Sequence, residues 1–233
     1  METFSLEGWY ILLRWFHVLS GITWIGMLYY FNLVQTPFFA TELGGQAKSL
    51  MTRGLVPNAL WWFRWGAMFT FITGVLYVLT RWGHENVMLS SDYMTRILTG
   101  GLLGTTMWAN VWFVIWPAQQ VVIANATKVA GGGEADPTAP ARGARSGLVS
   151  RTNVLFSIPM AFFMVSASHF TALGIEKNLT LYWIVVLGLV GVMEINALVG
   201  TGQARQKPLS TVSGTIHLGL LLTFFLFAAL SLL

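Results

Sequence analysis

Long apolar stretches recur along almost the whole chain, and short segments between them carry most of the polar residues. A helix that crosses a bilayer needs about 20 consecutive, mostly apolar residues. Six stretches meet this requirement, at residues 9–34, 60–82, 97–124, 149–173, 179–201 and 210–233. The pattern predicts an all-α integral membrane protein, a bundle of about six transmembrane helices that forms a single domain over residues 1–233.

Two connecting segments differ from the short loops elsewhere. Residues 35–58 are only moderately apolar, which leaves room for a short interfacial helix between the first two spans. Residues 127–147 include the run GGGEADPTAPARGARSG. Glycine and proline at this density oppose regular structure, so this segment is predicted to be a flexible cytoplasmic loop.

Composition supports the membrane assignment and excludes several classes of function. Only 9% of the residues are charged and 55% are hydrophobic, whereas about 25% of the residues of soluble domains are charged. Without cysteine, the chain cannot form disulfides, iron–sulfur clusters, thiolate metal sites or a covalent haem c attachment. No phosphate-binding loop, nucleophile triad or zinc motif is present, which argues against a hydrolase or an ATP-driven pump.

Lysine and arginine are distributed unevenly between the two sets of loops and adjoining helix ends. Nine belong to one side: Lys48, Arg53, Arg64, Lys128, Arg142, Arg145, Arg151, Arg205 and Lys207. Four belong to the other: Arg14, Arg81, Arg96 and Lys177. Since the richer side normally faces the cytoplasm, both termini are expected in the periplasm and the protein in the bacterial inner membrane, with several passes. The net charge of +4 is not gathered into a patch for nucleic acid.

Histidines within the spans are the first candidates for chemistry, because ionisable groups are costly in the bilayer and commonly mark function. His17 lies about two turns into the first span, and His169 lies about one turn from the outer end of the fourth. Two histidines at similar depth on facing helices are what a bis-histidine haem b requires. Arg14 shares the face of His17 and suits a propionate, and Gly21 on that face leaves room for a macrocycle.

Each of these residues also has a purely structural interpretation. A membrane histidine can simply hydrogen-bond to a neighbouring helix. An arginine near an interface can extend its side chain to the headgroups, and a glycine can let another helix approach closely. The residues alone leave haem binding and helix packing both open.

Other polar side chains in the spans are Asn110, Asn153, Glu194 and His217. Glu194 lies in the inner half of the fifth span, and His217 lies about two turns into the sixth from the same side. Because these spans are consecutive, the two side chains could pair. The pair could relay protons near a quinone, or it could only fix the contact between the helices, and we favour the second interpretation.

Four stretches, in order, resemble the membrane domain of the bacterial membrane-bound urate oxidases, a family in which that domain is joined to a periplasmic cytochrome c domain. They are LLRWFHVLSGITWIGMLYY, WWFRWGAMFTFITGVLYV, GTTMWANVWFVIWPAQQ and RTNVLFSIPMAFFMVSASHF. The resemblance covers residues 12–170, includes His17 and His169, and is weaker beyond Phe170. The chain departs from the family in having only residues 84–96 where an extra helical hairpin is expected, and in looking like a short form without the cytochrome c domain.

The resemblance implies a redox function. The expectation is an electron-transfer subunit that binds haem b through His17 and His169 and passes electrons to a separate periplasmic cytochrome c. One alternative is a urate oxidase that uses such a separate cytochrome. The other is a non-catalytic accessory subunit of a larger respiratory or oxygenase complex in the membrane.

Overall fold

The computed structural model of the protein describes residues 5–170 and 178–233. These residues form helices and connections, without strands. The longer helices are α1 (Leu6–Tyr29), α3 (Glu42–Glu85), α4 (Asp92–Ala109), α5 (Trp116–Ala130), α6 (Ala139–His169), α7 (Leu179–Leu198) and α8 (Val212–Leu232). The shorter ones are η2 (Tyr30–Gln35), α2 (Thr36–Phe39), η3 (Asn110–Ile115) and η4 (Ala204–Ser210).

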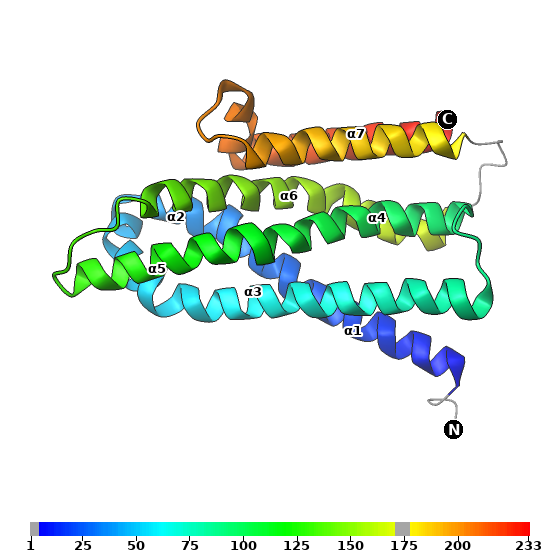
Figure 1. Cartoon of the computed structure of the whole chain (residues 1–233), viewed down its shortest axis with the longest axis horizontal. Helices are drawn as coiled ribbons and strands as arrows, with labels where there is room; N and C mark the ends of the chain where they lie inside the picture. The colour runs from blue at the N-terminus through cyan, green and yellow to red at the C-terminus, as the bar shows by residue number, and fades with distance from the viewer. Residues whose placement is uncertain (1–4, 171–177) are drawn as a thin grey trace.

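Six helical units within these residues are long and apolar enough to cross a bilayer, and they run roughly along the long axis of the molecule (Figure 1). α1 with η2 and α2 forms the first, α3 the second, and α4 with η3 and α5 the third. α6, α7 and α8 form the other three. The predicted number and order of helices are therefore confirmed, and their length and composition indicate a multi-pass membrane protein.

Hydroxyl side chains set the starts of several helices. Ser5, Thr41, Ser91 and Thr211 each accept a hydrogen bond from the backbone N–H three residues later, at the starts of α1, α3, α4 and α8. Such caps satisfy amides that lack a partner within the helix. At the other end of α3, Asn86 adopts a left-handed conformation with φ of 53°, a common way for a helix to stop.

Helices extend further into two connecting segments than the sequence pattern predicted. α3 begins at Glu42 and continues through Pro57, so residues 42–58 belong to the second helical unit, and the short α2 ends the first. Helix also covers most of residues 127–147, because α5 runs to Ala130 and α6 starts at Ala139. Proline in the first turn of α6 is compatible with helix, since the N–H it lacks would have no partner there. Flexibility of residues 131–138 stays a prediction, and positions 171–173 of the fourth predicted span lie outside the described residues.

Two helices widen into π-helical turns just before a proline. η2 ends two residues before Pro37, and η3 ends two residues before Pro117. A proline ring clashes with the carbonyl four residues earlier and has no N–H to donate. The wider turn instead uses bonds to the fifth residue back, as from Thr36 N–H to the Phe31 carbonyl. The helix therefore continues past the proline.

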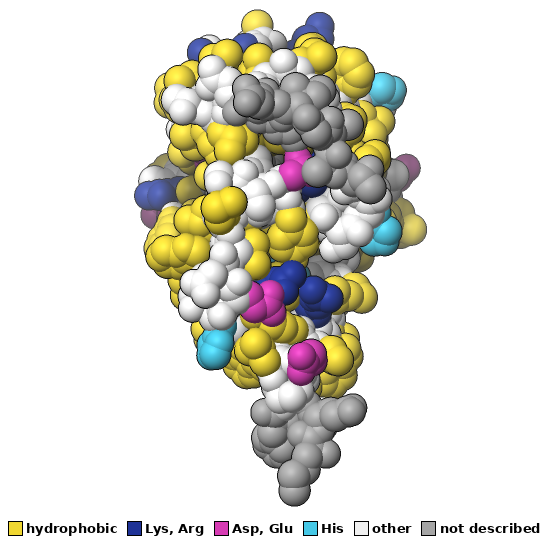
Figure 2. All heavy atoms as spheres, turned by 90° about the vertical axis from the view of Figure 1, so that its right-hand side faces the viewer, with side chains coloured by type: hydrophobic (Ala, Val, Ile, Leu, Met, Phe, Trp, Pro, Cys, Tyr) yellow, Lys and Arg dark blue, Asp and Glu magenta, His cyan; other side chains and the backbone are white. Residues whose placement is uncertain are grey.

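α6 is the central helix of the bundle. It packs most extensively on α4 and α8 and also contacts α1, α5 and α7, whereas α1 packs mainly on α3. Large side chains such as Trp24, Phe63, Phe156 and Tyr182 fill the interior. α1 begins and α8 ends at the same end of the bundle, which Figure 2 views directly as a mostly apolar face with a few charged side chains near its middle. Which side of a membrane this end faces stays a prediction.

Candidate functional site

His17 lies on the face of α1 that packs against α3. Its Nδ1 is 3.1 Å from Thr73 Oγ1, and a Cβ added at Gly74 would come within 3.1 Å of the ring carbon Cε1. The Thr73 hydroxyl donates its single proton to the Phe69 carbonyl at 2.6 Å. With that proton on the Phe69 carbonyl, the hydroxyl accepts from Nδ1–H of His17, and this assignment of the ring hydrogen leaves Nε2 with a free lone pair.

His169 is the last residue of α6 and is exposed. Its Nδ1 lies 2.8 Å from the Val165 carbonyl, and because a carbonyl can only accept, Nδ1 carries the hydrogen here too. His217 makes the same contact with the Ser213 carbonyl of its own helix at 2.7 Å. All three histidines thus present Nε2, but only His17 of the three is oriented by a side chain from another helix.

The two predicted ligands have different helices as neighbours. Phe170, which follows His169, packs its ring against Phe227 of α8 with a centroid distance of 5.6 Å, and Arg96 of α4 lies 5.4 Å from the Phe170 ring. His17 instead contacts α3. Between these two histidines, the described part of the chain shows neither a hydrogen bond nor a ring contact.

Gly21 lies one turn after His17, also at the contact between α1 and α3. A Cβ added there would lie 4.0 Å from the Thr70 side chain. On the facing helix, a Cβ added at Gly66 would lie 3.0 Å from the backbone nitrogen of Trp24, so the two backbones approach closely. The close helix approach therefore depends on Gly66, whereas a Cβ at Gly21 would make only an ordinary contact. A role for Gly21 beside a cofactor stays a prediction.

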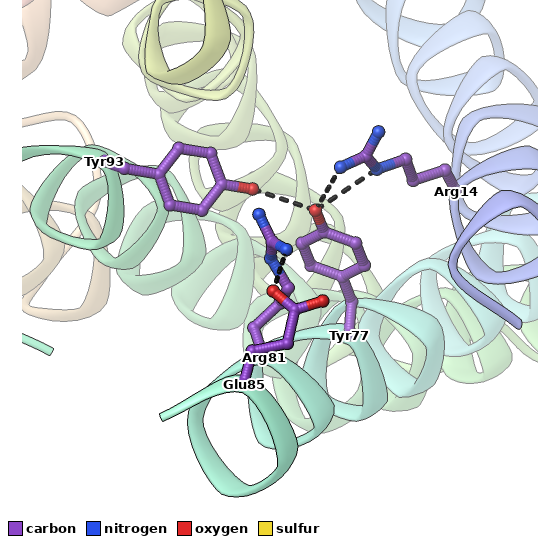
Figure 3. A network of polar contacts seen from close by, with 5 residues as sticks. All are labelled: Arg14, Tyr77, Arg81, Glu85 and Tyr93. Atoms are coloured by element: carbon purple, nitrogen blue, oxygen red, sulfur yellow. Dashed lines mark hydrogen bonds and ion pairs between the residues drawn. The ribbon is translucent and has the colours of Figure 1, made fainter. Parts of the chain in front are cut away.

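Arg14 belongs to a polar cluster where α1, α3 and α4 meet (Figure 3). Its guanidinium donates to the Tyr77 hydroxyl, with Nη2 at 2.6 Å and Nε at 3.2 Å, and the Tyr77 and Tyr93 hydroxyls are 2.9 Å apart. Arg81 pairs with Glu85 and lies 5.4 Å from the Tyr93 ring. Sequence reasoning did not find the two tyrosines. Arg14 is exposed and, within the described residues, is in no ion pair, so it retains donors for an anionic group.

Asn110, Asn153 and Glu194 meet inside the bundle, although they come from three different helices. The Asn110 amide donates to Asn153 Oδ1 at 2.9 Å and to Glu194 Oε2 at 3.1 Å. The Asn153 amide donates to the Met107 carbonyl at 3.0 Å, just before the π-helical turn. The predicted pairing of Glu194 with His217 is therefore wrong: Glu194 bonds to Asn110, and His217 bonds within its own helix.

Asn153 is one of four polar residues that form a stripe along α6, at positions 146, 150, 153 and 157. The spacing of four, three and four residues places them on one face of the helix. Each bonds to a different partner: Ser146 to Gln119, Ser150 to Asn32, Asn153 to Asn110 and Ser157 to Tyr29, at 2.8–2.9 Å. This helical spacing of polar residues is the sequence signal from which the stripe could have been predicted.

Comparison with known proteins places the chain in a family. The sequence model of the urate oxidase N-terminal family matches residues 75–226. The chain belongs to this family. The family match includes Asn110, His169, Glu194 and His217, and so extends well beyond the point where the sequence resemblance was expected to weaken. His17 lies before the matched range. No curated protein and no solved structure matches the chain.

Proposed function

We propose that the protein is a membrane-embedded electron-transfer subunit of a urate oxidase type of system, with haem b held by His17 and His169. The observation that carries the proposal is the contact between His17 Nδ1 and Thr73 Oγ1, at 3.1 Å. The Nδ1–H of His17 is bonded to Thr73 of a neighbouring helix, so its Nε2 lone pair is available. Histidines that bind metals commonly donate their other ring N–H to a protein oxygen, which fixes the ring and strengthens the ligand. The donor chemistry therefore fits haem iron.

Other residues have supporting roles in this proposal. His169 presents the same nitrogen from the end of α6, and Arg14, one turn before His17, has donors for a propionate. Haem b, when bound, supplies reversible one-electron exchange. The Thr73 hydroxyl fixes the tautomer of His17, and Gly74 leaves space for the edge of its ring.

The partner in this proposal is a periplasmic cytochrome c. Several cations gather at the end of the bundle where α3 and α6 begin: Lys48, Arg53, Lys128, Arg142, Arg145, Arg205 and Lys207. This excess of lysine and arginine favours a cytoplasmic position for that end. Arg14 and His169 then lie toward the periplasmic side of the inner membrane, where a soluble cytochrome could accept electrons. A more specific form of the proposal is that the protein oxidises urate and passes the electrons to such a cytochrome.

The decisive experiment is a dithionite-reduced minus oxidised visible spectrum of the detergent-purified chain, with the haem extracted and quantified. We expect a b-type spectrum at one haem per chain, lost in both His17→Ala and His169→Ala. His217→Ala is the matched control, because its ring has the same bond to its own helix, and it should retain the spectrum. Thr73→Val should keep the haem but shift its reduction potential.

A flat spectrum from well-folded protein would exclude the electron-transfer role and favour an accessory subunit, identified by co-purification with a larger complex. Retention of the full spectrum in either ligand variant would refute that ligand. Urate consumption by membranes that contain the chain and a cytochrome c, lost in the His17→Ala variant, would support the oxidase form.

A further inference from the structure

A cavity of about 530 Å³ lies between the first half of α6, the η2–α2 segment and η4. It is at the opposite end of the bundle from the Arg14 cluster, near the connections that leave α5 and α7. Its polar lining includes Asn32, Thr36, Ser210 and two cations, Arg151 and Lys207. Pockets of 300–1,000 Å³ are typical of small-molecule sites.

The two cations in this cavity have no acidic neighbour to balance them. No aspartate or glutamate lines the cavity, and the ion pairs found within residues 5–170 and 178–233 involve only Arg81 and Arg96. Arg151 donates from Nη1 to the Leu209 carbonyl at 2.8 Å, which leaves its remaining donors for another group. Arg151 is partly buried, whereas Lys207 is exposed. A partly buried cation without a counter-charge is costly, so an anion beside Arg151 would be stabilised.

The surrounding charge favours the same kind of ligand. Besides Arg151 and Lys207, the helix ends and connections on this side carry Lys48, Arg53, Lys128, Arg142, Arg145 and Arg205. The cavity also has apolar walls, from Leu148 and Leu209 among others. A free phosphate ion gains nothing from contact with an apolar wall, whereas the glycerol backbone and first acyl carbons of a lipid would pack against it. Basic pockets between membrane helices on the cytoplasmic side are known to hold anionic lipid headgroups.

We propose that this cavity binds the phosphate headgroup of an anionic phospholipid, with Arg151 and Lys207 as the phosphate-binding cations. The amide of Asn32 already donates to Ser150 and to its own helix, so it holds the wall of the site in place. A lipid bound here would contact both α6 and η4, which is part of the connection between α7 and α8. The proposal depends on the position of the bundle in a membrane but not on haem.

The test uses the full chain in detergent, titrated with dioctanoyl phosphatidylglycerol and followed by isothermal calorimetry. Dioctanoyl phosphatidylcholine and inorganic phosphate serve as separate titrants. We expect phosphatidylglycerol to bind at one molecule per chain and the other two to bind much more weakly. Lys207→Gln should weaken the binding of phosphatidylglycerol about fivefold, the effect of one basic residue near a membrane surface.

Matched variants separate the site from general charge. Lys48→Gln removes an exposed lysine at the same end that does not line the cavity, and it should leave binding unchanged. Arg151→Lys keeps a cation if Arg151→Gln fails to fold. An equal loss of phosphatidylglycerol affinity in the Lys48 and Lys207 variants would overturn the proposed site. Equal affinity for phosphatidylglycerol and phosphatidylcholine would also overturn it. Strong binding of inorganic phosphate that competes with the lipid would make this a free phosphate site and overturn the lipid assignment.

Discussion

The junction of Asn110, Asn153 and Glu194 gives the sharpest test of how the bundle is held together. Asn153 is fully buried and makes two bonds to the third helical unit, at 2.9 Å to the Asn110 amide and at 3.0 Å to the Met107 carbonyl. Replacing it by alanine removes both. Interhelical hydrogen bonds in membranes contribute on average about 0.6 kcal/mol and at most about 1.7 kcal/mol each. The Met107 carbonyl keeps a partner, because the backbone N–H of Asn110 also donates to it. Loss of the two side-chain bonds in Asn153→Ala should therefore cost about 1–2 kcal/mol.

The assay is SDS-induced unfolding in mixed micelles, followed by tryptophan fluorescence, which reports the free energy of unfolding. Asn58→Ala is the matched control, because Asn58 is exposed on α3 and its amide reaches only its own helix at 3.5 Å. The control should change stability by less than about 0.5 kcal/mol. If Asn153→Ala is as stable as the control, the junction does not stabilise the bundle and the reasoning is refuted. Asn110→Ala and the double variant then measure the coupling between the two amides.

Two further predictions concern other elements. Gly219→Ala should lower the free energy of unfolding by about 1–3 kcal/mol, because the new Cβ would lie 2.9 Å from the Leu155 carbonyl oxygen. Gly188→Ala is the control that should not destabilise the protein, because a Cβ there would have nothing within 4 Å. An equal loss of stability in both variants would refute the clash. The hydrogen bonds that Thr138 donates from its backbone N–H and hydroxyl hold the pKa of Asp136 below its usual range. The stability that these bonds provide is present above the pKa of Asp136 in the unfolded chain, and it is lost as pH falls through the pKa in the folded protein. In Asp136→Asn, the melting temperature should therefore fall less steeply below about pH 4. A variant with the same pH profile as the unmodified protein would contradict this.

Hydropathy predicted the number and order of the helices because each must supply an apolar surface about as long as the bilayer is thick. It could not place their ends, because a helix can continue past the apolar region when its polar turns are exposed or packed on neighbours. α3 shows this most clearly: it begins at Glu42, well before the apolar stretch that starts at Leu60.

The candidate site was predictable in its residue types but not in its contacts. Glu194 and His217 are on consecutive spans, which suggested a pair. The rotation of α7 about its axis instead directs Glu194 toward Asn110. Rotation of a helix about its axis is weakly specified when apolar residues surround it, as they do in α7 and α8. Tyr77 and Tyr93 were missed for a related reason, because tyrosines near a membrane interface are common and only the structure joins these two to Arg14.

The stripe on α6 also bears on how the chain is made. Its partners Tyr29, Asn32, Asn110 and Gln119 all precede α6 in the sequence. During synthesis, the first three helical units are therefore already present when α6 is released into the bilayer, and each polar group of the stripe can be satisfied at once. The order of translation therefore allows assembly in the same order, with α7 adding the bond of Glu194 to Asn110 after the stripe has formed.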